Sequence, residues 1–388
     1  MLHLKRRRFI RLSLLGALTF SLPQRALASK LKNNENPRLS LETDALGMRL
    51  LPEFSARIVA HSGHKPINNG NYHWHNAPDG GACFASDDSG WVYVSNSESG
   101  FGHGGAGALK FNAQAEVIDA YPILNGTNQN CGGGATPWGS WLSCEEIPDG
   151  QVWECDPEGI QPAQARPALG LFKHEAVAVD PVNHQLYLTE DMPDSCLYRF
   201  TPSGMDHQGI PNLTSGTMEV ARVIQGQTGR VEWIRLPDPY AQKIPTRLQV
   251  SNATPFNGGE GITYYEGRLF FTTKGDNRVW QYTIADQQIE ILYDDDTHPT
   301  PELSGVDNIT VSNQGTIYVA EDGGNLQIVA ITKDNQVFPV VELVGHDDSE
   351  ITGIAFSPDG SRLYFSSQRG STGQSKHGVT YEIRGPFI

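Results

Sequence analysis

Basic residues are scarce in this sequence, and the shortage limits the partners that the protein can have. Its 388 residues include 29 lysines and arginines against 44 aspartates and glutamates. Six of the basic residues and none of the acidic ones lie in the first 28 positions, so the rest of the chain carries a formal net charge of −21. A chain this acidic repels phosphate backbones, which argues against a nucleic-acid partner. Solubility, bound divalent or trivalent cations, or both account for the acid excess.

The sequence also lacks an apolar run long enough to cross a membrane. The run from Leu12 to Leu22 is shorter than the ~20 apolar residues that a bilayer requires. It follows a basic head and precedes Ala26-Leu27-Ala28, whose small residues are typical of a signal-peptidase site. We therefore expect residues 1–28 to be a signal peptide rather than a basic amphipathic anchor, and the mature protein to have no stable membrane anchor.

The basic head indicates a route of export. Arg6-Arg7-Arg8-Phe9-Ile10-Arg11 resembles a twin-arginine signal, although an ordinary secretory signal with extra arginines is the alternative. We expect recognition by the Tat translocon, which exports folded proteins and so suits a protein that takes up metal in the cytoplasm. The expected location is periplasmic or secreted.

Cysteine is rare, and its count is odd. The five residues are Cys83, Cys131, Cys144, Cys155 and Cys196. An oxidising compartment permits disulfides, but an odd number leaves at least one thiol unpaired, either as a ligand or simply buried.

Helical periodicity is absent over long stretches, while 41 glycines and 24 prolines favour many short strands. A short β-pattern with a central aromatic residue recurs six times along the chain. Successive intervals are 48, 46, 83, 48 and 46 residues, and four of these five match one four-stranded propeller blade. The central aromatics are Tyr93, Trp141, Tyr187, Phe270, Tyr318 and Tyr364.

We therefore predict an all-β, six-bladed β-propeller as a single domain over residues 51–388, after a linker over 29–50. The long interval indicates a loop insertion over about Thr201 to Pro255, although a degenerate seventh blade is the alternative. A stacked array of β-sandwiches is the competing fold.

The repeats share chemistry at the start of one strand. Ten to fourteen residues before the central aromatics lie a cysteine and several acids: Cys131, Glu175, Glu260, Asp307 with Asn308, and Glu350. In a propeller this strand lies nearest the central channel, so these side chains are expected to converge. Crowded carboxylates raise each other's pKa values unless a cation is bound, and oxygen ligands suit Ca²⁺ or a trivalent metal. The thiol indicates a transition metal as well.

A second acidic set follows the aromatic strands. Neighbours within each acidic pair point in opposite directions, so only about half of the set is expected to face a site. Its members are Glu98, Glu145, Glu146, Glu190, Asp191, Glu321 and Asp322.

These residues resemble a known family. Asn130-Cys131-Gly132-Gly133, followed by Thr136 to Glu146, closely resembles the signature of PhoX-type alkaline phosphatases, and similar elements follow in order to about residue 368. The resemblance implies a six-bladed propeller that holds Fe³⁺ and Ca²⁺ in its channel and hydrolyses phosphoesters outside the cytoplasm. The metal ligands that it implies are Glu98, Cys131, Glu146, Glu175, Glu260, Asn308 and Glu321. A Cys131–Cys144 disulfide is the alternative for that thiol.

The sequence departs from the family at Gly258-Gly259, where the phosphatases carry a basic residue before Glu260. Phosphoryl transfer requires cationic stabilisation of developing charge. In this chain, the positive charge comes either from the metals alone or from one of a few basic residues. The candidate catalytic residues are Lys274, Arg278 and Arg369, with Lys173 as a further cation.

We therefore predict a phosphoric ester hydrolase that acts as a monomer on a small phosphoester. Two other functions remain open. One is a calcium-dependent propeller lactonase, which also places Glu and Asn ligands around a central ion. The other is a non-catalytic metal-binding propeller that serves as a binding module.

Overall fold

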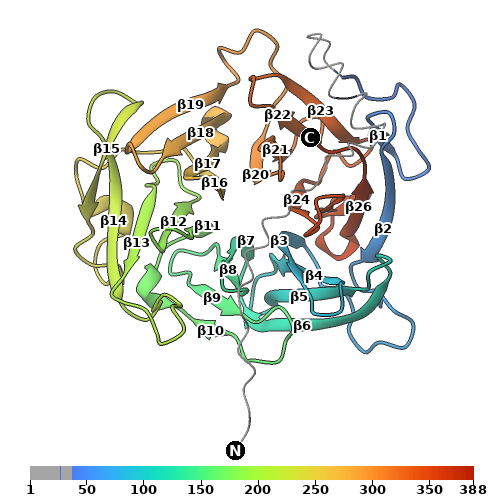
Figure 1. The fold of residues 1–388 in the computed structure, drawn as a ribbon, viewed down its shortest axis with the longest axis horizontal. Coiled ribbons are helices and arrows are strands. Elements are labelled where there is room, and N and C mark those ends of the chain that lie inside the picture. The colour runs from blue at the N-terminus through green and yellow to red at the C-terminus, as the bar shows by residue number, and fades with distance from the viewer. Residues whose placement is uncertain (1–26, 28–36) are drawn as a thin grey trace, which may run out of the picture.

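Short antiparallel hairpins recur along the chain, as the repeated aromatic pattern predicts. The structure is a computed structural model that describes residue 27 and residues 37–388. The predicted signal peptide, apart from residue 27, lies outside the described residues. Figure 1 shows the strands arranged as a ring of sheets around a central axis, which is a propeller-like arrangement. No helix among the described residues is long and apolar enough to span a bilayer.

Four sheets of the ring have four or five strands each. The first contains β3 (Pro78–Ala85), β4 (Trp91–Ser97), β5 (Gly104–Phe111) and β6 (Val117–Thr127). The second contains β7 (Asn130–Ala135), β8 (Trp141–Glu145), β9 (Val152–Cys155) and β10 (Gln164–Ala165). The next contains β20 (Val306–Val311), β21 (Ile317–Glu321), β22 (Gln327–Ile331), β23 (Val337–Leu343) and β1 (Met48–Leu50). The last contains β24 (Ile351–Phe356), β25 (Arg362–Ser367), β26 (Val379–Arg384) and β2 (Ser55–His61).

The fifth sheet has nine strands and interrupts the predicted pattern. It contains β11 (His174–Asp180), β12 (Gln185–Glu190), β13 (Tyr198–Pro202), β14 (Gly216–Val223), β15 (Gly229–Arg235), β16 (Gly259–Tyr265), β17 (Arg268–Thr273), β18 (Arg278–Thr283) and β19 (Gln288–Asp294). β15 lies within the predicted insertion and pairs with β19, which joins two runs of strands at their outer edges. The all-β propeller arrangement is confirmed, but hydrogen bonding does not divide the described strands into six separate blades.

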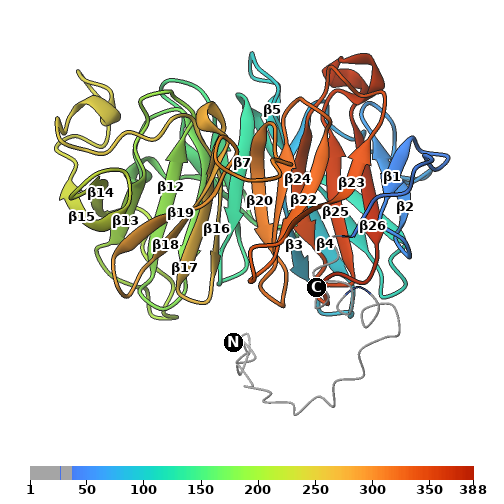
Figure 2. The ribbon, with the colours of Figure 1, turned by 90° about the horizontal axis from the view of Figure 1, so that it is seen from above.

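The inner strands form the wall of the channel. β3, β7, β11, β16, β20 and β24 each contact the next, and β24 returns to β3, so the described strands close a ring. Glycines permit this close approach. A Cβ atom on Gly134 would lie 1.8 Å from the carbonyl oxygen of Val177, and one on Gly132 would lie 2.4 Å from that of Glu175. Side views show these strands running roughly along the short axis of the disc (Figure 2).

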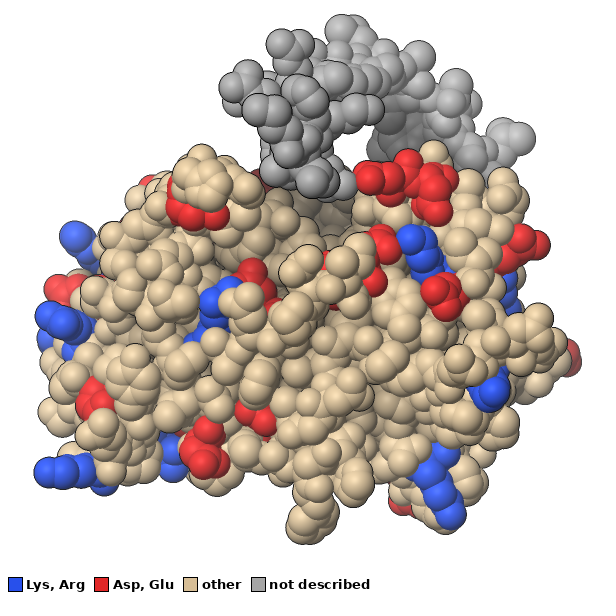
Figure 3. All heavy atoms as spheres, turned by 90° about the horizontal axis from the view of Figure 1, so that it is seen from below, with Lys and Arg blue, Asp and Glu red and all other residues tan. Residues whose placement is uncertain are grey.

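The core lies between neighbouring sheets. All six predicted central aromatics are buried, each in the second strand of its hairpin. Tyr93 and Tyr364, for example, stack with ring centroids 5.1 Å apart across the contact between the first and last sheets. Besides strands, the described residues form five single-turn 3₁₀ helices: η1 (Pro167–Leu169), η2 (Thr246–Leu248), η3 (Lys274–Asp276), η4 (Gly370–Thr372) and η5 (Ser375–His377). On the edge shown in Figure 3, acidic and basic side chains are interspersed.

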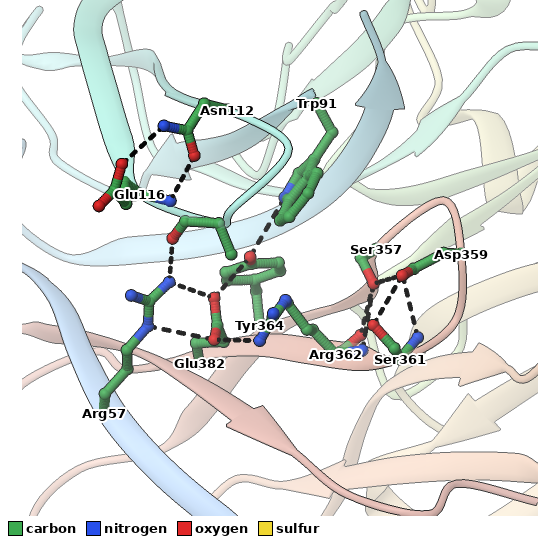
Figure 4. A network of polar contacts seen from close by, with 11 residues as sticks. Arg57, Trp91, Asn112, Glu116, Ser357, Asp359, Ser361, Arg362, Tyr364 and Glu382 are labelled. Carbon is green, nitrogen blue, oxygen red and sulfur yellow. Dashed lines mark hydrogen bonds and ion pairs between the residues drawn. The ribbon is translucent and has the colours of Figure 1, made fainter. Parts of the chain in front are cut away.

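A polar network in the last sheet links β2 to β25 and β26 (Figure 4). The buried Glu382 carboxylate on β26 accepts hydrogen bonds from Arg57 Nε at 3.1 Å, Arg362 at 2.9 Å and the Tyr364 hydroxyl at 2.7 Å. Trp91 of the first sheet donates to the same hydroxyl at 3.1 Å. Residues at both ends of the described chain therefore meet at one carboxylate, which closes the ring.

Replacing Glu382 by Gln is expected to lower the free energy of unfolding by about 3 kcal/mol, because two guanidinium groups lose their carboxylate partner. Urea denaturation measures the change. Glu158→Gln removes the partly exposed ion pair with Lys110 and is the matched control, with an expected loss below about 1 kcal/mol. Equal losses in the two variants would show that Glu382 does not fasten the ring.

Candidate metal centre

Each inner strand presents one side chain at the same structural position. In each hairpin, the first residue of the inner strand pairs with the last residue of the second strand. The pairing register of the two strands then shifts at a β-bulge. Bulges re-aim side chains and are common beside functional sites. We call the residues that follow the first paired position the inner ring: Asp79, Cys131, Glu175, Glu260, Asp307 and Thr352.

A second ring lies directly after the second strands. At the same end of the channel, one residue directly follows each second strand and is no longer paired in its β-ladder. The second strands are β4, β8, β12, β17, β21 and β25. We call these residues the outer ring: Glu98, Glu146, Asp191, Lys274, Asp322 and Gln368.

The two rings, together with Glu350 directly before β24, bring potential metal ligands into four groups, and within each group the ligand atoms lie within 4.8 Å of one another. The groups are Cys131–Glu146–Glu175, Glu175–Glu260–Asp307, Asp307–Asp322–Glu350 and Asp79–Glu98–Glu350. Consecutive groups share Glu175, Asp307 and Glu350, so the ligands form one continuous belt, which we call the acidic belt.

Burial and mutual repulsion disfavour ionised carboxylates in the acidic belt. Burial raises the pKa of Glu175 well above its usual value, and the nearby Glu260 and Glu146 raise it further. The pKa of Glu146 rises to about 8 through burial and the charge of Glu98. That of Asp307 rises to about 7 through burial and the charge of Asp322. Bound cations would remove the repulsion that these groups exert on each other.

The donor set fits metal ions. Glu175 is 1% exposed, and its Oε2 has no hydrogen-bond partner among the described residues. Its Oε1 lies 3.3 Å from Cys131 Sγ. An orphaned, buried carboxylate oxygen beside further carboxylates suits a hard cation, and the adjacent thiol suits a transition metal. The described residues therefore provide room and ligands for more than one metal ion.

The cysteines are all free in the described part of the chain. Cys131 is in the acidic belt, whereas Cys144 is buried in the apolar cluster around β8 and β11. Burial raises the pKa of the Cys131 thiol, and the charges of Asp79 and Glu175 raise it further. The alternative Cys131–Cys144 disulfide is not formed in this structure.

Five of the seven predicted metal ligands lie in the acidic belt: Glu98, Cys131, Glu146, Glu175 and Glu260. Glu321 lies elsewhere. It is buried, its Oε1 accepts a hydrogen bond from the Ser304 backbone N–H at 2.6 Å, and its Oε2 accepts one from that of Gln327 at 2.9 Å. These contacts give Glu321 a role in holding loops, and its neighbour Asp322 is the one that joins the belt.

Asn308 also makes contacts other than those expected of a ligand. Its Oδ1 accepts a hydrogen bond from the Gly353 backbone N–H at 2.7 Å, and its Nδ2 donates to Asp307 Oδ1 at 2.8 Å. Asn308 therefore links β20 to β24 and orients Asp307. Asp79 was absent from the predicted set altogether, although its place opposite the end of β4 is equivalent to that of Glu175 opposite β12.

Three cations contact the acidic belt. Lys274 Nζ lies 2.7 Å from Glu260 Oε1, Lys173 Nζ lies 2.8 Å from Glu146 Oε1, and Arg369 lies 2.8 Å from Glu350 Oε1. The predicted catalytic residue Arg278 is not among them, because its guanidinium pairs with Asp276 and Asp294. The structure thus brings Lys274 and Arg369 to the belt, together with Lys173.

The opposite end of the channel is chemically different. A cavity of about 510 Å³ there is lined mainly by apolar and small residues of the inner strands, among them Val177, Ile262 and Ile354. The polar end of the channel, rather than this cavity, carries groups able to act on a charged substrate.

Comparisons with known proteins agree with this arrangement. The sequence model of the family described as "Alkaline phosphatase PhoX" matches residues 96–161 and 148–291, about half of the chain. No curated protein matches the chain in sequence. The structure of Pseudomonas fluorescens PhoX in complex with vanadate, a transition-state analogue, is similar with a TM-score of 0.75 and 17% identity, covering 90% of this chain and 98% of that one. A Bacteroides thetaiotaomicron protein of unknown function has a TM-score of 0.53 and 10% identity, covering 85% and 76%.

The family match begins at Asn96 and includes the Cys131 to Glu146 segment on which the predicted resemblance depends. That resemblance is confirmed by the family match, and the shared fold agrees with it. The chain belongs to the PhoX family of alkaline phosphatases, which are phosphoric ester hydrolases.

Proposed function

We propose that this protein is an exported, metal-dependent phosphoesterase whose metal ions are bound by the acidic belt. The observation that carries the proposal is the belt itself: four groups of ligands, sharing members, at one end of a propeller channel. Metal ions bound there would stabilise the charge that develops on a phosphoryl group. We count the nine-stranded sheet as two blades joined by β15, which gives six blades around this site.

We assign Fe³⁺ to the group that contains Cys131 and Ca²⁺ to the groups made of carboxylates alone. Thiolate ligands favour transition metals over calcium, and the Cys131–Glu146–Glu175 group is the only thiol-containing one among the described residues. Carboxylate oxygens in groups of three suit the larger, flexible coordination of calcium.

The chain's own cations complete the site. Lys274 and Arg369 have side chains that are 39% and 30% exposed, so solvent-borne substrate reaches them. Ammonium and guanidinium groups bind phosphoryl oxygens with charge-assisted hydrogen bonds, and here they supply the positive charge that Gly258-Gly259 does not. The substrate is therefore a small phosphoester, and no part of the proposal requires a nucleic acid.

Export through the Tat translocon and monomeric action in the periplasm or outside the cell are parts of the same proposal. The support is the twin-arginine pattern in residues 1–28, which lies outside the described residues apart from residue 27. Folding before export allows iron and calcium to be bound inside the cell.

Purified protein loaded with iron and calcium is expected to hydrolyse an aryl phosphate at alkaline pH, and vanadate is expected to inhibit it. The assay compares phosphomonoesters, phosphodiesters and lactones, with metal content measured on the same sample. Turnover of lactones alone would identify a lactonase. If the protein at full metal occupancy binds phosphoesters or lactones but turns over neither, it is a metal-binding module and the phosphoesterase is rejected.

A further inference from the structure

Two lysines share one carboxylate at the edge of the acidic belt. Lys173 Nζ lies 2.8 Å from Asp191 Oδ2, and Lys274 Nζ lies 3.4 Å from the same oxygen. The two nitrogens are therefore within roughly 6 Å of each other, a span that the oxygens of one phosphoryl group can bridge with hydrogen bonds of ordinary length.

Each ammonium group keeps a donor for a ligand. Lys173 uses one N–H for Glu146 and one for Asp191, and Lys274 uses one for Glu260 and one for Asp191. Because an ammonium has three N–H donors, each lysine retains one. The side chains are 28% and 39% exposed, so these donors are open to solvent.

The backbone holds both lysines in place. Asp191 N–H donates to the Lys173 carbonyl at 3.3 Å, and Lys274 N–H donates to the Gly258 carbonyl at 2.9 Å. Gly258 has φ of 72°, and a Cβ atom there would lie 3.3 Å from Lys274 Cγ and 3.5 Å from Asp191 Oδ1. Glycine at this position therefore leaves room for the Lys274–Asp191 contact in a conformation that other residues rarely adopt.

The charges around the pair set a condition for binding an anion. When Glu146, Glu260 and Asp191 are all ionised, they outnumber the two lysines, so the surroundings are then net negative in the absence of a bound cation. Metal ions bound by Glu146 and Glu260 would reverse that balance. An anion is then attracted to the lysines only after the metals have bound.

We propose that Lys173 and Lys274 form a two-point binding site for a phosphoryl group, and that Asp191 is a positioning residue that keeps the two ammonium groups together. The inference deepens the proposed phosphoesterase, on which it rests for the choice of phosphate as ligand. Phosphate binding is accordingly metal-dependent and lysine-dependent.

The direction in which Asp191→Asn changes the affinity for phosphate separates two possible roles of Asp191. If Asp191 only repels anions, removing its charge tightens phosphate binding. If it positions the lysines, the variant weakens binding although the site has become more positive. We expect the affinity of metal-loaded protein for inorganic phosphate, measured by titration calorimetry, to fall about 10-fold in Asp191→Asn and about 10- to 100-fold in Lys173→Gln and Lys274→Gln. Lys173→Arg, which keeps the charge, is expected to retain most of the affinity.

Metal content and a matched lysine complete the experiment. Lys110→Gln removes an ion-paired lysine of similar exposure from β5 of the first sheet, which is not the sheet of the lysine pair, and should leave phosphate binding unchanged. Metal content should be unchanged in all four variants of the lysine pair, because Lys173, Lys274 and Asp191 belong to none of the ligand groups. Metal loss in these variants, or unchanged or tighter phosphate binding in Asp191→Asn, would overturn the inference.

Different results would reject the lysine site and the phosphoesterase activity. Wild-type protein that hydrolyses phosphoesters, with lysine variants that bind phosphate normally, overturns the lysine site and leaves the phosphoesterase standing. Wild-type protein without turnover, in which phosphate still binds through the lysines, supports the site and rejects the enzyme.

Discussion

Replacing Glu175 by Gln is expected to reduce kcat for an aryl phosphate by more than about 100-fold and to remove at least one bound metal ion. Glu175 belongs to two of the ligand groups, has one oxygen without a partner and contacts Cys131 with the other. An amide offers a single neutral oxygen, so both groups lose a charged ligand at once. Metal analysis and steady-state kinetics on the same preparation measure the two effects.

Stability gives an independent readout for the same substitution. Metals that bind only the folded protein raise its thermal midpoint, and that rise should be much smaller in Glu175→Gln. Without metals the variant should be no less stable than the wild type, because one of several crowded carboxylates has been removed.

Glu321→Gln is the matched control for a buried glutamate outside the belt. Glu321 accepts backbone N–H groups with both oxygens, so its amide variant should lose about 1–3 kcal/mol of stability while keeping its metals. If Glu321→Gln lost metal and Glu175→Gln did not, the acidic belt would not be the metal centre.

The repeated aromatics predicted the fold well because they occupy the most constrained place in each hairpin. Tyr187, for example, is buried between the two runs of strands of the nine-stranded sheet, and Phe270 is buried between that sheet and the sheet that contains β20. In both places an aromatic fills the space that other side chains leave. The joining of β15 to β19 was not predictable in this way. Its strand segment, Gly229–Arg235, carries no repeat pattern, and its pairing partner lies more than fifty residues further along the chain.

The residues of the site were predicted less completely than the fold. Counting residues back from a central aromatic does not give the strand register, and the register decides which residues lie opposite each other. Asp79 lies fourteen residues before Tyr93, whereas Cys131 lies ten before Trp141, because β3 is two residues longer than β7 and Tyr93 lies two residues further into its strand than Trp141 does. The pairing of Pro78 with Ser97 and of Asn130 with Glu145 shows that the two positions are equivalent. The β-bulge in β20 also limits prediction at Asp307. Asp307 and Asn308 are adjacent in the sequence, but their side chains point in different directions and have different partners.

Replacing Cys131 by Ser is expected to remove iron selectively. The thiol is the soft ligand in the Cys131–Glu146–Glu175 group, and serine keeps nearly the same shape with a harder, less readily ionised donor. The calcium-type groups built around Asp307 and Glu350 do not include Cys131 and should keep their metal. Iron loss, loss of thiolate-to-iron visible absorption and a more than about 100-fold fall in kcat are the expected results.

Cys144→Ser is the control, because Cys144 is fully buried in an apolar cluster and does not belong to the belt. Its hydroxyl would be buried among apolar groups, so this variant should lose stability by about 1–3 kcal/mol while retaining iron and activity per folded molecule. The difference between the variants is therefore in metal content, not in folding. Equal iron content in wild type and Cys131→Ser, or a Cys131–Cys144 disulfide found by mass spectrometry of the exported protein, would show that the Cys131 thiol is not an iron ligand.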